Sequence, residues 1–307
     1  MNFLALLLGL ALERVLTHLF HLREFRWLDP LFDAHLRRLR ATTGGKARRW
    51  TALALTLALA ALLVAPVALL SVTLRGQLLQ IPYFGFAVIL LLFSLGPRDL
   101  DDEVEDFGDA LETGDIETQR RVAEQLLERP PAALAAERNE AIERAIYVQA
   151  NNRIFGVVFW FLVLGPTGAW AFRVLDLLRH RAELKEADAA GQTGVVRTMD
   201  AVRTLHGLLA WIPSRLLALG YVLAGNFEEA MAGWRNTGRE ATLPFPEGTT
   251  EVVARVGIAA SGRGALDVAD AVEALDRIRG ARSLVMRTLW MIWCPVIAVL
   301  TLYDWLR

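Results

Sequence analysis

The sequence predicts an all-α, polytopic helical membrane protein with cytoplasmic helical segments and broken or re-entrant helices. Three observations predict this class. The chain is 54% hydrophobic with a mean hydropathy of +0.34, whereas an ordinary soluble domain is about 45–50% apolar. The apolar residues gather in long runs, of which Trp50 to Thr73 is the clearest. Arginine-rich segments flank several of these runs, as the positive-inside rule expects of cytoplasmic loops.

The totals also exclude some classes of partner and site. The formal net charge of −1 gives no overall attraction to nucleic acid, and we expect none as a partner. Cys294 is the only cysteine, so an intrachain disulfide and a cysteine-based metal site are both excluded.

We predict one domain over residues 1–307, and its first segment is an N-terminal helix with a basic stretch, residues 1–49. Residues 1–20 read as a retained helix, because Glu13 and Arg14 stand where a signal peptide needs small residues. Residues 21–49 carry eight Arg or Lys against three acids and directly precede an apolar run, which places them in the cytoplasm.

Residues 50–96 are expected to form a transmembrane hairpin, with Trp50–Thr73 and Ile81–Leu95 as its arms. Residues 97–150 then read as a cytoplasmic helical insert. Its first part, 97–117, holds ten acids against one base, and we interpret it as a solvated face without a metal site. Amphipathic spacing predicts two helices behind it, over 115–129 and 131–149.

Residues 151–225 hold two apolar segments that we expect to be broken. Asn151–Leu178 is interrupted by Gly165-Pro166, and the next segment by Trp211-Ile212-Pro213. Proline removes a backbone donor and clashes with the preceding turn, and in lipid such a break needs protein or water around it. The arginine-rich flanks favour a re-entrant arrangement, with kinked spanning helices as the alternative.

The remaining chain divides into a soluble helical segment, residues 226–282, and a C-terminal transmembrane helix, residues 283–307. In the soluble segment we expect helices around 227–234 and 266–279, a loop at 243–248, and a turn at 262–265. The last helix carries aromatic residues suited to the membrane interface: Trp290, Trp293, Tyr303 and Trp305.

Motifs of catalysis and metal binding are weak. His18, His21 and Glu24 have ligand-compatible spacing, but interfacial histidines explain them better. Ser214 and Ser261 have no partner that the sequence identifies, and no phosphate loop or dinucleotide fingerprint is visible. We therefore assign no catalytic residue and no metal ligand, and the sequence identifies no cofactor.

Polar residues within or beside the apolar runs are the stronger signal. Such groups are costly at membrane depth and mark a functional site by default. Arg173 also stands three residues before Asp176, a spacing that suits a structural ion pair on a helix. The candidate ligand-binding residues are Asn151, Asn152, Arg153, Arg173, Asp200, Trp211, Arg215 and Asn226.

Several motifs recur in the same order in the CobD/CbiB superfamily. They are Arg98-Asp99-Leu100, the turn at 114–117, the NNRIFGVVFWFLVLGP segment at 151–166, Arg197-Thr198-Met199-Asp200, Trp211-Ile212-Pro213-Ser214-Arg215 and the segment 226–230. The resemblance covers nearly the whole chain. It is closest to the AmpE branch, inner-membrane proteins linked to control of an inducible β-lactamase in Gram-negative bacteria.

The other branch resembles an enzyme that joins an aminopropanol unit to a corrinoid side-chain carboxylate in cobalamin synthesis. Its motif Glu-x-x-x-Glu-Asn-x-x-Asp-Gly keeps Asn152 and Gly156 here. A carboxylate that binds a metal or acts as a base cannot be replaced by phenylalanine or glycine, so this comparison argues against the enzyme's chemistry. The positions that have changed are Tyr147, Asn151 and Phe155 in that motif, and His206, Gly207 and Ala210 before Trp211.

The resemblance thus implies a multi-pass protein of the bacterial inner membrane that acts as a regulator or sensor linked to β-lactamase induction and cell-wall stress. It favours a non-catalytic role. The implied partners are the lipid bilayer and a cell-wall-derived small molecule or another membrane protein. The alternative is the cobalamin enzyme, with its carboxylates supplied by the acidic segment 99–117. A third reading, a transporter for a cell-wall fragment, fits the broken segments but lacks an inverted repeat.

Overall fold

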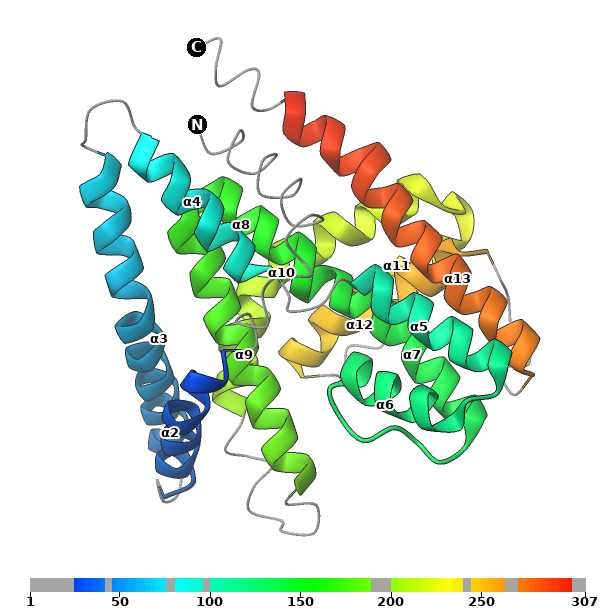
Figure 1. Ribbon diagram of the computed structural model, residues 1–307, viewed down its shortest axis with the longest axis horizontal. Helices are drawn as coiled ribbons and strands as arrows, with labels where there is room; N and C mark the ends of the chain where they lie inside the picture. The colour runs from blue at the N-terminus through cyan, green and yellow to red at the C-terminus, as the bar shows by residue number, and fades with distance from the viewer. Residues whose placement is uncertain are drawn as a thin grey trace. The chain divides into compact units, whose positions relative to one another are not determined.

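The computed structural model describes residues 25–41, 46–75, 81–95, 100–188, 200–239, 244–262 and 270–299. Within these ranges every element is helical and no strand occurs (Figure 1). Four helical runs are long and apolar enough, by length and composition, to cross a membrane: Arg49–Arg75, Ala135–Leu164, Asp200–Ala224 and Ala271–Val299. The predicted fold class, an all-α polytopic membrane protein, is confirmed.

The chain divides into two compact units. Unit 1 is Met1–Pro97 with Gly156–Leu209, and unit 2 is Arg98–Phe155 with Ala210–Arg307. The chain changes unit after Phe155 and after Leu209, and both points lie inside continuous helical runs. The expectation of one domain with six segments stays a prediction.

Unit 1 is organised around α9, which packs against α2, α3, α4 and α8. The predicted hairpin of residues 50–96 is present as α3 and α4, which pack on one another (Figure 1). The described helices of the unit are η2 (Arg26–Leu28), α2 (Asp29–Ala41), α3 (Lys46–Arg75), α4 (Ile81–Ser94), α8 (Gly156–Leu164), α9 (Pro166–Asp188) and the first part of α10 (Asp200–Ala224).

Helix α3 presents large apolar side chains outward. Leu57, Leu62, Leu69 and Val72 are each more than half exposed. A soluble monomer rarely exposes so many large apolar side chains on one helix, whereas a run of Ala, Leu and Val of this length matches the hydrocarbon core of a bilayer. The helix is therefore suited to face lipid.

The predicted break at Gly165-Pro166 is confirmed. Helix α8 ends at Leu164, and α9 begins at Pro166. Gly165 between them has a φ of 70°, which a residue without a Cβ adopts at little cost. Pro166 has its φ fixed near the helical value and needs no donor in the first turn. Because α8 and α9 then pack on each other, this stretch is a helical hairpin.

The predicted break at Pro213 is wrong, because α10 is one continuous helix with Pro213 inside it. A proline in a helix leaves the carbonyl four residues earlier without its donor. That carbonyl belongs to Leu209, and the indole Nε1 of Trp160 donates to it at 3.0 Å. A side chain from α8 thus replaces the missing backbone donor, and the helix continues through the proline.

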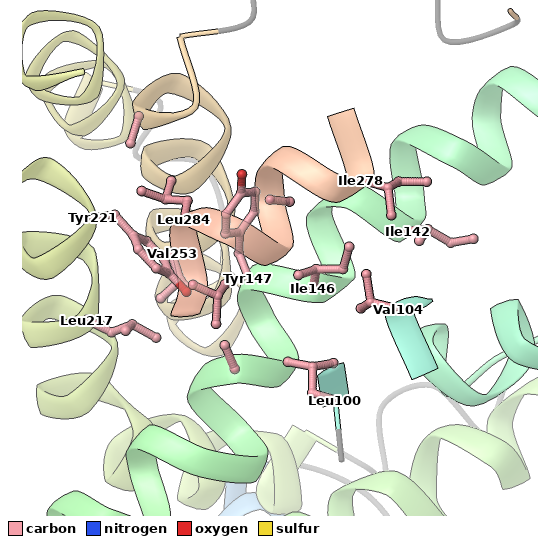
Figure 2. Packing of buried hydrophobic residues seen from close by; sticks show 14 of the residues in the cluster. Leu100, Val104, Ile142, Ile146, Tyr147, Leu217, Tyr221, Val253, Ile278 and Leu284 are labelled. Carbon is pink, nitrogen blue, oxygen red and sulfur yellow. The ribbon is translucent and has the colours of Figure 1, made fainter. Parts of the chain in front are cut away.

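Unit 2 is built around the buried face of α7. Its elements are α5 (Leu100–Thr113), α6 (Ile116–Leu127), α7 (Ala135–Gln149), the π-helical turn η3 (Ala150–Phe155), the second part of α10, α11 (Phe227–Arg239), α12 (Phe245–Ala260), α13 (Ala271–Arg287) and the π-helical turn η5 (Thr288–Trp293). Figure 2 shows Tyr147 of α7 and Tyr221 of α10 inside the buried core, with Val253 of α12 and Leu284 of α13.

Three boundaries differ from the prediction. The loop expected at 243–248 is wrong, because α12 begins at Phe245. Pro246 lies in the first turn of this helix, where backbone N–H groups make no bond within the helix, so its lack of an N–H costs nothing. The boundary expected at residue 150 falls inside one apolar helical run, 135–164. The last run that is long and apolar enough to span is Ala271–Val299, which begins before the predicted boundary at 283 because α13 continues into η5.

Several predictions lie outside the described residues. These are the N-terminal helix of residues 1–20, the spacing of His18, His21 and Glu24, and the anchors Tyr303 and Trp305. Of the other two anchors, Trp290 is 61% exposed while Trp293 packs against the core of unit 2.

Candidate functional site

The π-helical turn η3 brings three predicted site residues together. Asn151, Asn152 and Arg153 are buried, at 3%, 5% and 8% exposure. A π-helical turn inside an α-helix is rare and is frequent at functional sites. Because burial of three polar side chains is costly without partners, their contacts decide what this segment can do.

Each guanidinium nitrogen of Arg153 has a hydrogen-bond partner, and the three partners lie on α5, α6 and α7. Its Nη1 donates to Glu103 Oε2 at 2.6 Å, its Nη2 to the Gln125 carbonyl at 3.1 Å, and its Nε to Gln149 Oε1 at 3.2 Å. The guanidinium therefore connects η3 with α5 and α6. A charge buried with an opposite charge and further hydrogen bonds is the arrangement that makes such burial tolerable.

Glu103 is a site residue that the sequence analysis did not identify. It lies in the acidic segment interpreted as a solvated face, and it is 4% exposed. The signal is its register, since Leu100, Val104 and Phe107 place it on the apolar side of α5. An acid on the buried face of a helix needs a cationic partner, and that partner is Arg153.

Asn151 lies on η3 with one polar atom unused. Its Nδ2 donates to Asn152 Oδ1 at 3.2 Å. Its Oδ1 is buried and has no hydrogen-bond partner among the described residues. The arrangement offers a buried acceptor to a ligand that donates a hydrogen bond.

The three positions that carry acids in the cobalamin-enzyme branch are packed here by aromatic contacts and an amide. Tyr147 is fully buried, with its ring 5.3 Å from that of Tyr221 in an edge-to-face arrangement. The Phe155 ring lies 4.9 Å from that of Trp293. Asn151 is the third position. Positions 147, 151 and 155 therefore hold no acid, and two of them contact aromatic rings of α10 and η5.

A second buried polar cluster lies in unit 1 and contains Arg173. Its Nη1 donates to Asp176 Oδ2 at 2.9 Å, which is the predicted i,i+3 pair. Asp176 Oδ1 also accepts from Arg179 Nη2 at 2.8 Å and lies 3.5 Å from His206 Nε2. The resemblance to the enzyme branch implies an aspartate at position 206. Here that position holds His206, and the carboxylate beside it is that of Asp176 on α9.

Trp211 and Arg215 form a pair on α10. The Arg215 guanidinium lies 4.3 Å from the centre of the Trp211 ring, and its Nη1 donates to the Trp211 carbonyl at 3.1 Å. Trp211 is 41% exposed. A cation over an indole face is a stabilising contact in itself, and it leaves the other guanidinium nitrogens available.

Asp200 and Asn226 lie at helix ends. Asp200 is exposed at the start of α10. Asn226 precedes α11, where its Oδ1 accepts from Glu229 N at 3.4 Å and its Nδ2 donates to Glu229 Oε1 at 3.0 Å. This is an N-terminal cap. Arg173 and Asp200 belong to unit 1, and the other six predicted residues belong to unit 2.

A second buried ion pair lies one turn before Tyr147. Glu143 of α7 is 1% exposed and pairs with Arg277 of α13. Carboxylates therefore remain in the core of unit 2, at positions other than those of the enzyme branch. Among the residues that the structure describes, no group of three or more His, Cys, Asp or Glu is placed to hold a metal ion.

Comparison with known proteins gives two curated relatives. The "Cobalamin biosynthesis protein CobD" of Stutzerimonas stutzeri (strain A1501) is 27% identical over 172 residues, 55% of this chain and 55% of the relative. The protein of the same name from Chromobacterium violaceum is 30% identical over 214 residues, 68% of this chain and 62% of the relative. The chain thus spans less than two thirds of either relative. No solved structure matches it.

These names overturn the expected role in β-lactamase regulation, because both relatives are named for cobalamin biosynthesis. The expectation rested on the replacement of three acids, but the core of unit 2 keeps buried carboxylates at other positions, Glu103 of α5 and Glu143 of α7. The CobD/Cbib family model matches residues 6–245, most of the chain. The chain therefore belongs to the CobD/CbiB family.

Proposed function

We propose that this protein acts in cobalamin biosynthesis, where it joins an amino alcohol to a side-chain carboxylate of a corrinoid. Membership of the family and the names of the two relatives support this role. Since the chain spans only part of each relative, the activity is carried over as a proposal. The chemistry is amide formation: the amine nitrogen bonds to the carboxyl carbon, one carboxyl C–O bond breaks, and that oxygen leaves as water with two protons, one of them from the amine.

One observation carries the proposal: Glu103 of the acidic segment lies against the π-helical turn, on Arg153. Attack by an amine needs a base that takes its proton, and it needs donors that stabilise the oxyanion that forms. The enzyme branch has acids at positions 147, 151 and 155. Here Glu103 supplies, from a different helix, a carboxylate to Arg153, the residue that follows the Asn151-Asn152 pair.

The proposed site centres on Asn151 and Asn152, with Arg153 and Glu103 beside them. Asn151 Oδ1 offers an acceptor to a donor group of the amino alcohol, and the amide groups offer donors to the carboxyl oxygens. Arg215 on Trp211 is a second group suited to an anion. Arg173, Asp200 and Asn226 stay ligand candidates, but their observed contacts are an ion pair and helix ends.

Complementation tests the proposal. A strain that lacks its corrinoid-modifying enzyme of this family is supplied with the wild-type gene, with Glu103→Gln and with Asp106→Asn. Asp106 is an exposed acid on the same helix and is the matched control. We expect wild type and Asp106→Asn to restore growth without added cobalamin, and Glu103→Gln to fail at equal membrane abundance. If wild type accumulates in the membrane and growth still requires cobalamin, the proposal is wrong.

We also propose that the protein is a multi-pass protein of the bacterial inner membrane, with the basic segment 21–49 in the cytoplasm. The four apolar helical runs and the distribution of Arg and Lys support this. Within the family, the lack of acids at 147, 151 and 155 supports a place near the AmpE branch. This concerns ancestry, and a tree built from many family sequences tests it.

A further inference from the structure

Four aromatic side chains lie at or beside positions 147, 151 and 155, where the resemblance to the enzyme branch implies acids. We call Tyr147, Phe155, Tyr221 and Trp293 the aromatic frame. Tyr147 pairs with Tyr221 at 5.3 Å, and Phe155 pairs with Trp293 at 4.9 Å. The two pairs adjoin, because a Cβ at Gly220, the neighbour of Tyr221, would lie 2.6 Å from Trp293 Nε1. Asn151 lies between Tyr147 and Phe155 on the chain, about one helical turn from each.

Three buried polar atoms on η3, α10 and η5 have no hydrogen-bond partner among the described residues. They are Asn151 Oδ1, Tyr221 Oη and Trp293 Nε1. Asn151 is 3% exposed and Tyr221 is fully buried. Buried polar atoms in native proteins are nearly always paired, because an unpaired one loses its bonds to water without replacement. Two of them on the aromatic frame and a third on Asn151 of η3 point to a bound polar group.

The unpaired atoms define the chemistry of that group. Asn151 Oδ1 only accepts, Trp293 Nε1 only donates, and a tyrosine hydroxyl does both. No side chain of the frame is charged, and the nearby Arg153 is held by Glu103, Gln149 and the Gln125 carbonyl. An ammonium ion would leave the indole N–H unpaired and bury a charge without a counter-charge.

We propose that the aromatic frame binds a small uncharged molecule through a hydroxyl group, which accepts from Trp293 Nε1 and donates to Asn151 Oδ1. The identity of the ligand as an amino alcohol rests on the proposed function. The frame then holds the amino alcohol as the free amine. That form has the lone pair needed to attack a carboxyl carbon, whereas the ammonium does not.

Fluorine NMR on protein labelled with 5-fluorotryptophan, in detergent, tests this. The resonance that disappears in Trp293→Phe identifies Trp293. We expect 1,2-propanediol at millimolar concentration to shift it. We expect 1-amino-2-propanol to bind roughly tenfold or more weakly at pH 7, where it is an ammonium, and to approach the diol near pH ~10, where alkyl amines titrate. Equal or tighter binding of the ammonium or of Mg²⁺ overturns the proposal, as does no response to the diol.

Variants separate ligand binding from folding. Tyr221→Phe removes a hydroxyl that has no hydrogen-bond partner among the described residues, so we expect an unchanged or higher melting temperature together with loss of the response to the diol. Tyr83→Phe is the control, because Tyr83 Oη accepts from Arg75 Nη2 at 2.9 Å. It should lower the melting temperature and keep the response. A Tyr221→Phe protein that melts lower and still responds contradicts the proposal.

Asn151→Asp tests the charge preference directly, because it places a carboxylate on the frame without changing its size. We expect the preference to reverse, with 1-amino-2-propanol at pH 7 binding more tightly than the diol. If the diol stays preferred, Asn151 is not the acceptor. Complementation is read separately: growth without a response to the diol defeats only this inference, and a response without growth defeats only the proposed function.

Discussion

Arg153 is the residue on which three elements of unit 2 depend. Its guanidinium bonds a carboxylate of α5, a carbonyl of α6 and an amide of α7. In a buried setting the attraction between two opposite charges mainly offsets their lost hydration. The pair therefore fixes the register of α5 against η3, while the apolar stripe of α5 provides the burial.

We predict that Arg153→Ala destabilises the protein by about 3–5 kcal/mol, because it leaves the Glu103 charge buried without a partner. Thermal and denaturant unfolding in detergent measure the loss. The double variant Arg153→Met with Glu103→Leu should recover most of it, since no uncompensated charge remains. A double variant as unstable as the sum of the two single variants would contradict this explanation.

His35 gives a pH-dependent contribution in unit 1. Burial lowers its pKa below 6.5, and the nearby Arg38 adds to this. The neutral ring lies 3.2 Å from the Thr56 hydroxyl oxygen. Because the unfolded chain takes up the proton first, this contribution is complete above pH about 6.5 and is lost as the pH falls through the lower folded pKa.

We therefore expect the melting temperature of the wild type to fall more steeply on acidification below pH about 6.5 than that of His35→Gln. A series of unfolding curves between neutral and mildly acid pH measures the two slopes. Parallel slopes for wild type and His35→Gln would contradict the assignment.

At the scale of elements, the sequence predicted what depends on local chemistry and missed what depends on distant partners. The break at Gly165-Pro166 was predictable, because a glycine followed by a proline ends and restarts a helix by itself. The continuity of α10 through Pro213 was not, since it depends on Trp160 from α8. Likewise the polar run at 151–153 was visible, but Glu103 lies 50 residues away from its partner.

Helix α12 packs closely on α7 at Gly257. A Cβ at this position would lie 2.5 Å from two atoms of the Tyr147 ring. We predict that Gly257→Ala destabilises the protein, because the overpacking cost of about 1–3 kcal/mol exceeds the gain in helix propensity of ~1 kcal/mol. Gly248→Ala is the matched control in the same helix, where nothing lies within 4 Å, and it should be neutral or stabilising. Equal effects of the two, by thermal unfolding, would contradict close packing at Gly257.

At the scale of the whole molecule, the exposed surfaces differ between elements. Helix α3 carries an outward apolar face, with Leu62 64% exposed, whereas α5 carries acids that pair with arginines of α13, such as Asp101 with Arg282. An apolar outward face belongs in lipid and a charged one in water. The exposed face of α3 is therefore suited to lipid, and that of α5 to water.

We predict that, in a Cys294→Ser background, Ile116→Cys reacts with a membrane-impermeant maleimide only after the inner membrane is opened. Ile116 is 71% exposed in the segment assigned to the cytoplasm. Leu62→Cys should stay unlabelled in both conditions and react only in denaturant, because lipid covers it. Labelling of Ile116→Cys in cells with an intact inner membrane would reverse the assigned orientation.

The hydrogen bond from Trp160 to the Leu209 carbonyl makes the effect of a substitution at position 160 depend on the residue at position 213. While position 213 holds proline, any replacement of Trp160 removes the donor that the helix itself does not supply. Once position 213 acquires an N–H, the same replacement loses only packing. The order of substitution therefore matters: the proline has to change first, and family members that keep a proline here should keep a side-chain donor on α8.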